Sequence, residues 1–216
     1  MNEEVKKPVP EPENENPKKL EKKLGWKKNL VLYLHDVIVY LVIICILFSL
    51  VFRIVVVSGT SMNLTLLDGD YLLLISNLIY QDPKYGDVVV VSKQSFDDGK
   101  PIVKRVIATE GQTVDIDFLS GTVYVDGKAL DEDYAWTKTK SHGGVQFPLT
   151  VDEGCVFVLG DNRGNSRDSR YPDIGLIDER EILGKAILLF LPGTNGTNPD
   201  GSPKLPRDYS RIGAIE

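Results

Sequence analysis

The chain has 216 residues, of which 42% are hydrophobic and 26% charged, proportions that fit a folded globular domain and exclude a wholly disordered chain. A net charge of −6 argues against nucleic-acid binding, which requires a basic face. Two Cys and two His are too few for a disulfide framework or a clustered metal site, so neither a metal nor a cofactor is expected.

The N-terminal region predicts a tail followed by a membrane anchor. Residues 1–29 mix Glu, Lys, Asn and Pro and are predicted to be disordered. Residues 30–57 are mostly apolar, and their uninterrupted part, Val37–Phe52, would span about 24 Å as a helix; the residues before it extend this to the ~30 Å of a hydrocarbon core. A core helix is disfavoured because no polar face recurs. A cleaved signal peptide is disfavoured by the long N-terminal region and the β-branched run Ile54–Val57.

Charge around the apolar segment predicts its orientation. Four lysines lie between residues 22 and 28 on its N-terminal side, whereas only Arg53 flanks its other end. Because positive charge is retained in the cytoplasm, we expect a single pass with a cytoplasmic N-terminus and an extracytoplasmic domain over residues 58–192.

The rest of the chain predicts a mainly β fold. Turn signals separate short runs rich in Val, Ile and Tyr: Tyr71–Ile75, Asp87–Val91, Ile102–Ala108, Val114–Asp117, Thr122–Val125 and Val156–Leu159. Gly121–Leu130 is predicted to be a hairpin on the Asp126-Gly127 turn. Glu179–Leu191 fits either a short helix or a strand, and residues 193–216 are expected to be a loose tail.

Three segments carry candidate chemistry, and the first contains Ser61. It reads Gly59-Thr60-Ser61-Met62, directly after the apolar segment. Gly59 permits unusual backbone angles, which would expose Ser61 beside backbone N–H groups able to form part of an oxyanion hole. A single loop serine is more often structural, so this segment alone does not identify a nucleophile.

The second segment, Ile102–Ile107, contains Lys104. As a strand it places Ile102, Lys104 and Val106 on one face, so that aliphatic neighbours shield the amine. Desolvation lowers the lysine pKa from its usual value of about 10.4, and a neutral amine can accept a proton from a serine hydroxyl. The alternative is an edge lysine that extends its amine into water.

The third segment is Gly160–Arg170, with the sequence GDNRGNSRDSR. Five charged side chains combined with Ser, Asn and Gly suit neither a strand nor a helix. They predict a loop held by its own ion pairs and hydrogen bonds, with a solvated turn as the simpler alternative.

In combination these segments resemble the bacterial type I signal peptidases. The Ser-Met pair, Gly86-Asp87, Lys104-Arg105 and the GDNRGNSRDSR loop occur in that family's order behind an N-terminal anchor. The resemblance covers roughly residues 30–190. It implies a compact, β-barrel-like peptidase domain of antiparallel sheets, similar to the smaller, Gram-positive-like members.

The resemblance implies roles for individual residues. Ser61 is the nucleophile, Lys104 the general base, and Ser166 the residue that orients the Lys104 amine through a hydrogen bond. Gly59 stands where some relatives carry a serine that donates to the oxyanion, so the oxyanion hole here would depend more on the Ser61 N–H. Two implied ion pairs fix the loop around the dyad: Asp161 with Arg105, and Asp168 with Arg170.

The implied substrates are secretory preproteins emerging from the translocation machinery. They would be cut after small residues, in an Ala-X-Ala-like pattern, at the outer face of the bacterial cell membrane. An extended signal peptide would bind as an added strand, and the positions that match its apolar pockets are Val55, Val57, Met62, Leu66, Ile102 and Val103. The implied partners are therefore preproteins and the lipid bilayer, with no nucleic acid.

Two positions depart from the family pattern. Leu64 replaces the proline that usually follows the Ser-Met pair, and Tyr171–Ile174 lengthens the link to Gly175. Neither change removes a reacting group, but both put the shape of the pocket in doubt.

Three other functions fit the sequence less well. A Ser-His-Asp hydrolase is disfavoured because His35 lies in the anchor and His142 in a loop without a nucleophile-elbow motif. A repressor-like self-cleaving Ser/Lys peptidase would not need an anchor. A catalytically silent, membrane-tethered peptide-binding homologue would be expected to have lost Ser61 or Lys104, and both are present.

Overall fold

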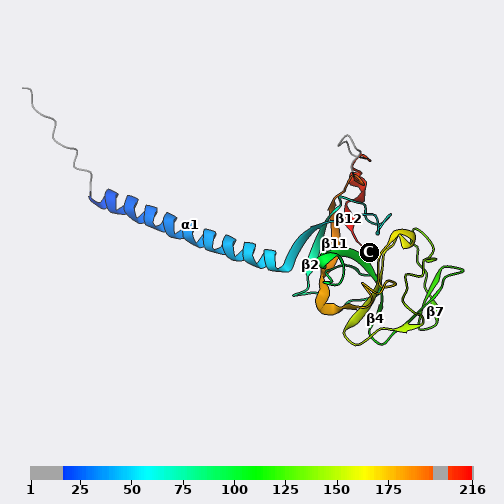
Figure 1. Cartoon of the computed structure of the whole chain (residues 1–216). Helices are drawn as coiled ribbons and strands as arrows, with labels where there is room; N and C mark the ends of the chain where they lie inside the picture. The colour runs from blue at the N-terminus through cyan, green and yellow to red at the C-terminus, as the bar shows by residue number, and fades with distance from the viewer. Residues whose placement is uncertain (1–16, 197–203, 216) are drawn as a thin grey trace, which may run out of the picture. The chain divides into compact units, whose positions relative to one another are not determined.

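A computed structural model describes residues 17–196 and 204–215, with side chains described for Trp26 and from Asn29 onward. The chain divides into two compact units, Met1–Leu47 and Phe48–Glu216. Helix α1 runs over Pro17–Val51 and is seen in Figure 1.

Helix α1 contains the one span among the described residues that is long and apolar enough to cross a membrane, Asn29–Val51, with a mean hydropathy of 2.6. Its 23 residues would extend over about 34 Å, slightly more than a ~30 Å hydrocarbon core. None of its most apolar window is buried against protein. A helix satisfies its own backbone hydrogen bonds, so this exposed apolar surface fits a lipid environment.

The helix boundaries differ from those predicted. The anchor was expected over 30–57, but the helix ends at Val51, and Phe52–Val56 form strand β1. These residues include β-branched Ile and Val, which favour a strand, and they pair with strand β2. Residues 1–16 of the predicted disordered tail lie outside the described residues, whereas 17–29 belong to α1, where Lys, Leu and Glu favour a helix.

Two antiparallel sheets make up the second unit. The larger has the order β1-β2-β11-β3-β4-β9-β10 with β12 also paired to β11, and the smaller has the order β7-β6-β5-β8. The strands are β1 (Phe52–Val56), β2 (Tyr71–Ser76), β3 (Val88–Val91), β4 (Ile102–Thr109), β5 (Thr113–Asp117), β6 (Thr122–Val125), β7 (Lys128–Ala129), β8 (Leu149–Thr150), β9 (Cys155–Leu159), β10 (Ile177–Asp178), β11 (Ile182–Leu191) and β12 (Gly213–Ala214). Short 3-10 turns are η1 (Asp97–Gly99), η2 (Arg163–Asn165), η3 (Glu179–Glu181) and η4 (Tyr209–Arg211).

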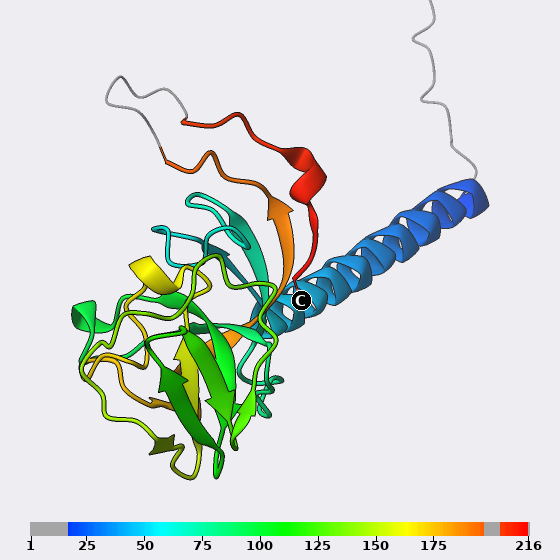
Figure 2. The same cartoon turned by 90° about the vertical axis from the view of Figure 1, so that its right-hand side faces the viewer.

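The burial of each strand follows its sequence. In β2, every second residue is buried, as expected for a sheet with one covered face. The four valines of β3 are all buried because this strand lies inside the sheet and is covered on both faces. Figure 2 shows how the strands curl around the interior of this unit. The mainly β, antiparallel prediction is confirmed.

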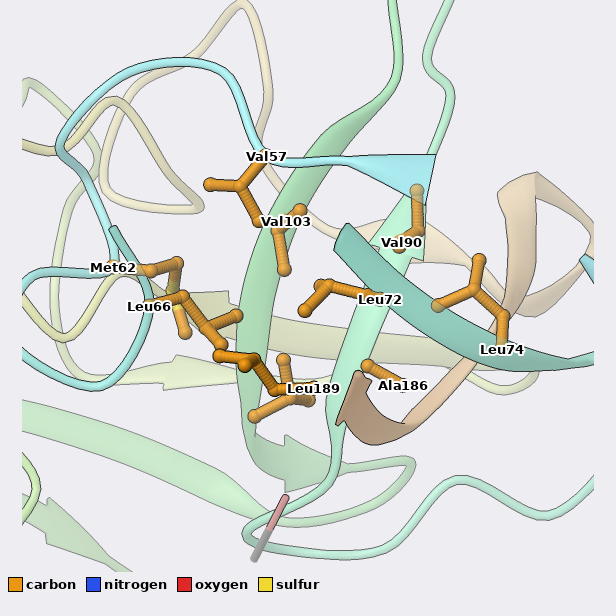
Figure 3. Packing of buried hydrophobic residues seen from close by; sticks show 10 residues of the cluster. Val57, Met62, Leu66, Leu72, Leu74, Val90, Val103, Ala186 and Leu189 are labelled. Carbon is orange, nitrogen blue, oxygen red and sulfur yellow. The ribbon is translucent and has the colours of Figure 1, made fainter. Parts of the chain in front are cut away.

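Three apolar clusters fill the interior of the β unit. The first lies beside the loop that follows β1 and includes Val57, Met62, Leu66, Leu72 and Val103; Figure 3 shows these side chains converging from several elements. The other two clusters pack on either side of β4 and β9. The first cluster is the one that borders the candidate site.

All six predicted strand segments are strands, with boundaries that shift by one residue at most. The hairpin on Asp126-Gly127 forms, with positive φ at both residues, 51° and 74°. Of the two alternatives for Glu179–Leu191, the strand is correct, since β11 begins at Ile182 after a single 3-10 turn.

The C-terminal prediction of a loose tail over 193–216 is wrong for the described part of that segment. Residues 204–215 return to the sheet, where β12 pairs with Leu188 and Leu189 of β11. The preceding stretch rich in Pro, Gly and Asn favoured a loose tail, but an ion pair, a short ladder and the packing of Ile215 hold residues 204–215 to the sheet.

Candidate active site

Ser61 lies in a loop of residues 57–70, here called the Ser61 loop, which connects β1 to β2. Hydrogen bonds join the two ends of the loop: Val57 N donates to Asp70 O (2.8 Å), and Gly69 N donates to Val57 O (2.9 Å). The loop is therefore of the Ω type, with its two ends held together by these hydrogen bonds.

Apolar side chains and a positive-φ glycine shape the interior of this loop. Met62 and Leu66 are buried in the first apolar cluster, and a backbone hydrogen bond of 2.8 Å joins them. Gly59 has a φ of +92°, which L side chains rarely adopt, and its N–H donates to Asp68 Oδ1 at 2.7 Å. Ser61 is held between the glycine turn and these buried anchors.

Lys104 reaches Ser61 from β4. The Nζ atom of Lys104 lies 2.8 Å from Oγ of Ser61 and 2.9 Å from the carbonyl oxygen of Val103. The two residues are 43 positions apart, and strand pairing of β4 with β3 and β9 fixes the lysine end of the contact. The side chain lies inside the unit, where Lys104 is 3% exposed.

Burial lowers the pKa of Lys104 to about 8, because the desolvated amine cannot hold its charge as easily as in water. The carboxylates of Asp168 and Asp161 act in the opposite direction, and the guanidinium of Arg170 adds a smaller lowering effect. A neutral Lys104 is therefore accessible at mildly alkaline pH.

The Gly160–Arg170 loop holds the backbone around Ser61. Asn162 N donates to Ser61 O (2.9 Å), and Asn162 Nδ2 donates to Thr60 O (3.0 Å). Asn165 Nδ2 donates to Thr60 Oγ1 at 2.8 Å. Sequence analysis did not assign roles to these two asparagines, and the only available signal was the density of short polar groups in the loop.

The predicted pair of Asp161 with Arg105 is present and bidentate, with N–O distances of 3.0 and 2.9 Å. Asp161 also accepts a hydrogen bond from Thr65 Oγ1 at 2.5 Å, which ties the Ser61 loop to the same carboxylate. Arg105 donates to Gly86 O (2.8 Å), and its guanidinium lies 4.2 Å from the centroid of the Tyr134 ring. Both members of the pair are almost fully buried.

The second predicted pair, Asp168 with Arg170, is also buried and bidentate, at 2.8 and 2.9 Å. Arg170 donates further to the carbonyl oxygens of Arg163 (2.9 Å) and Ser166 (3.3 Å), and Asp168 accepts from Gly160 N (3.1 Å). The pair therefore connects residues within the same loop, and the Asp168 carboxylate is stabilised further by the backbone hydrogen bond that it accepts.

A third ion pair, in which the arginine is buried and the glutamate part-buried, was not predicted. The guanidinium of Arg163, which is 1% exposed, donates to both carboxylate oxygens of Glu132 at 2.9 and 2.6 Å and to Thr139 Oγ1 at 2.7 Å. Glu132 lies 31 residues away in a segment without a recognisable pattern, so sequence alone gave no reason to pair them.

The expected hydrogen bond between Ser166 and Lys104 is not formed. Oγ of Ser166 is buried without a hydrogen-bond partner among the described residues, and Lys104 donates to Val103 O instead. A Cβ on Gly160 would lie 2.2 Å from Ser166 Oγ and 2.5 Å from Ser61 O, so the hydroxyl faces the Gly160 backbone. Gly160, also missed by sequence analysis, is required because any side chain there would collide with Ser61.

The residues expected to line the substrate pockets fall into two groups. Val57, Met62, Leu66 and Val103 belong to the first apolar cluster (Figure 3). Val55 packs against this cluster. Ile102 instead packs against the cluster on the other side of β3 and β4, because adjacent residues of a strand point to opposite faces.

No protein group among the described residues accepts a hydrogen bond from the Ser61 N–H. That donor lies on the same residue as the hydroxyl that contacts the Lys104 amine. A hydroxyl beside a shielded amine, with a backbone donor available nearby, can support nucleophilic attack on a carbonyl.

Several known proteins with similar sequences are signal peptidases. The family model "Signal peptidase, peptidase S26" matches residues 30–191. Signal peptidase I of Bacillus licheniformis is 34% identical over 182 residues, covering 80% of this chain and 94% of the relative. Signal peptidase I T of Bacillus subtilis is 35% identical over 192 residues, covering 84% and 95%. A crystal structure of a signal peptidase I from Enterococcus faecalis matches with 31% identity and a TM-score of 0.40, covering 48% of this chain and 96% of that one.

Proposed function

The chain belongs to the signal peptidase family, peptidase S26, and on this premise we propose that it cleaves secretory preproteins with Ser61 as nucleophile and Lys104 as general base. Family membership supports the removal of signal peptides by hydrolysis of a peptide bond. The observation that carries the residue assignment is the 2.8 Å contact between Lys104 Nζ and Ser61 Oγ inside a shielded site.

In the proposed first step the neutral Lys104 amine takes the proton of the Ser61 hydroxyl while Oγ attacks the carbonyl carbon of the scissile bond. The Ser61 N–H is the proposed donor to the oxygen that becomes negative. The Lys104 ammonium then returns the proton to the leaving amine, which departs and leaves an ester on Ser61. Water, deprotonated by the same amine, attacks this ester. The ammonium returns its proton to Ser61 Oγ as the ester bond breaks, and the signal peptide leaves as a carboxylate.

The surrounding loop has a supporting role in this proposal. The buried pairs of Asp161 with Arg105 and of Asp168 with Arg170 hold the loop that carries Asn162, which in turn fixes the Ser61 backbone. We assign Ser166 to the same supporting loop, where its hydroxyl faces the Gly160 backbone.

We further propose that the preferred cleavage site follows small residues in an Ala-X-Ala-like pattern. Val57, Met62, Leu66 and Val103 lie together beside Ser61 with Val55 at the margin of their cluster. In this proposal these aliphatic side chains supply the apolar surface that small residues of the substrate would contact, whereas Ile102 packs on the opposite face of the strand.

The proposed location is the outer face of the cell membrane, with α1 as a single anchor. The apolar span Asn29–Val51 supports the anchor, and the lysines that precede it support a cytoplasmic N-terminus. The proposed partners are preproteins leaving the translocation machinery and the lipid bilayer, and no nucleic acid.

Incubation of the purified full-length chain in detergent with a secretory precursor tests the assignment. We expect the wild type to release a mature protein whose new N-terminus, read by mass spectrometry, follows a small residue. Ser61→Ala should release none, while Ser120→Ala, which alters an exposed serine in the β5–β6 turn, should match the wild type. Cleavage at the same site by Ser61→Ala would refute the nucleophile.

A further inference from the structure

A C-terminal segment that follows the part of the chain matched by the family model contacts the Ser61 loop. The match ends at residue 191, and Arg211, 20 residues later, donates to both carboxylate oxygens of Asp70 at 3.0 and 2.6 Å. The same guanidinium donates to the carbonyl oxygen of Thr65 at 3.3 Å. A C-terminal side chain thus contacts two residues of the loop that carries Ser61.

Asp70 is the residue at which the loop closes. It is fully buried, and its carboxylate also accepts from Leu67 N (2.7 Å) and Gly193 N (2.6 Å). A buried carboxylate is costly unless it is paired and hydrogen-bonded, and Arg211 supplies the opposing charge. Loss of Arg211 would leave a buried negative charge at the base of the loop.

Further contacts fix Arg211 in place. Strand β12, which follows it directly, pairs with β11, and Ile215 packs against the cluster that contains Met62 and Leu66. Before it, Asp208 accepts from Ser210 N at 3.0 Å and caps the η4 turn. These contacts hold the segment that carries Arg211, whose side chain is 19% exposed.

Thr65 is held from two sides. Its hydroxyl donates to Asp161 of the Gly160–Arg170 loop, and its carbonyl oxygen accepts from Arg211. Thr65 is four positions after Ser61, and Leu66 next to it is buried. Movement of this part of the loop would shift Ser61 relative to Lys104, which is fixed on β4.

We propose that Arg211 is a positioning residue that holds the Ser61 loop at the distance from Lys104 that catalysis requires. This inference rests on the proposed Ser61/Lys104 mechanism and adds a C-terminal element to it. A displacement of the reacting groups by about 1 Å can lower the reaction rate about 100-fold. The contact of Arg211 with Asp70 can therefore affect the chemical step although Arg211 does not touch the substrate.

The test compares Arg211→Ala, Arg211→Lys and Asp70→Asn with a control variant, Arg180→Ala. The control removes the surface ion pair of Arg180 with Asp178, which takes no part in the Ser61 loop. Steady-state cleavage of a precursor peptide is measured with the full chain in detergent, under conditions where melting curves show each variant folded. We expect Arg211→Ala to lower kcat by roughly 10- to 100-fold with KM changed by less than about threefold. The midpoint of the pH–rate profile should stay that of the wild type.

Two further results are expected from the same series. Arg211→Lys should recover part of kcat, and the Arg211→Ala/Asp70→Asn double variant should lose less than the product of the two single losses, because the partners are in contact. Arg180→Ala should retain wild-type kcat.

Wild-type kcat for Arg211→Ala, or a loss fully explained by a reduced folded fraction, would overturn the inference. If Arg211→Ala does not fold, Arg211→Met decides: it keeps the length of the side chain but removes its charge and hydrogen-bond donors, so a folded methionine variant with unchanged kcat also overturns the inference. Ser61→Ala is run in parallel: activity in that variant would refute the mechanism itself, whereas an inactive Ser61→Ala beside a fully active Arg211→Ala refutes only the role of Arg211.

Discussion

A lysine side chain is normally charged and solvated, yet Lys104 is 3% exposed. Its hydrogen-bond partners in the described part of the chain are Oγ of Ser61 and the carbonyl oxygen of Val103. This environment disfavours the ammonium form and lowers the pKa to about 8. A lysine that loses its proton near working pH is suited to general-base chemistry, whereas an exposed lysine is not.

Substitution of Lys104 is expected to stop catalysis whether or not the charge is kept. An arginine at this position would stay protonated and could not accept the Ser61 proton, so Lys104→Arg and Lys104→Ala should each lose at least about 1,000-fold in kcat. Single-turnover cleavage of a precursor with equal amounts of folded enzyme measures this. Substantial turnover by the arginine variant would exclude Lys104 as the base, and Lys128→Arg, at an exposed position on β7, serves as the matched control.

The structure brings together the residues whose motifs occur in a fixed order, and it contains a pair that no motif indicated. Ser61 and Lys104 were chosen because Ser-Met and Lys-Arg occur in the family's order, and the structure places their reacting atoms together. The pair of Arg163 with Glu132 was missed because a single Glu in an irregular segment carries no pairing signal. The expected Ser166 contact was incorrect in detail, since side-chain rotation is not encoded in spacing.

The Gly160–Arg170 loop acts as a single element, because buried ion pairs connect it to β4 and to itself. Its first residue lies against Ser61 and Ser166, where a Cβ would approach Ser61 O to 2.5 Å. The loop therefore tolerates no side chain at this position without moving the Ser61 backbone.

Gly160→Ala is expected to reduce kcat strongly, by about 100-fold or more, because backbone displaced by the new methyl group carries Ser61 away from Lys104. Gly164→Ala in the same loop meets only Thr137 Oγ1 at 3.5 Å, an ordinary contact, and should stay within a few-fold of the wild type. Precursor cleavage by both variants at equal folded concentration is the measurement. Equal activity of the two would contradict the proposed close contact.

At the level of elements, the strands were predictable because Val, Ile and Tyr runs are bounded by glycine turns. Strand β1 was missed because, apart from Arg53, its apolar residues continue those of the helix, and its pairing with β2 is not visible in the sequence. Strands β8, β10 and β12 have two residues each, too few for a periodic pattern. Strand β12 lies next to the Arg211–Asp70 pair, whose members are 141 residues apart, and no local pattern reveals such a contact.

The whole molecule consists of helix α1, whose most apolar stretch is not buried against protein, and of a β unit that carries the candidate site. Only eight residue steps separate Arg53 from Ser61, so Ser61 lies within about 29 Å of Arg53 along even a fully extended chain. If α1 spans the membrane, the site is kept within reach of a bond close to the bilayer surface.

The expected topology can be tested with intact protoplasts. Protease added outside should digest the β unit, and an epitope placed at the N-terminus should remain protected until the membrane is lysed. Protection of the β unit in intact cells, together with exposure of the N-terminal epitope, would contradict the proposed orientation.

The protonation of the Lys104 amine is the most direct test of the Ser61/Lys104 assignment. Carbon-13 NMR of lysine Cε in the full chain in detergent, with the Lys104 signal assigned by its absence in Lys104→Arg, gives the titration midpoint. Because burial lowers the pKa, the amine should be charged below, and neutral above, a midpoint of about 8, and kcat/KM should rise with pH through the same value. A Lys104 midpoint near the ordinary value of about 10.4, with full activity at neutral pH, would contradict the assignment.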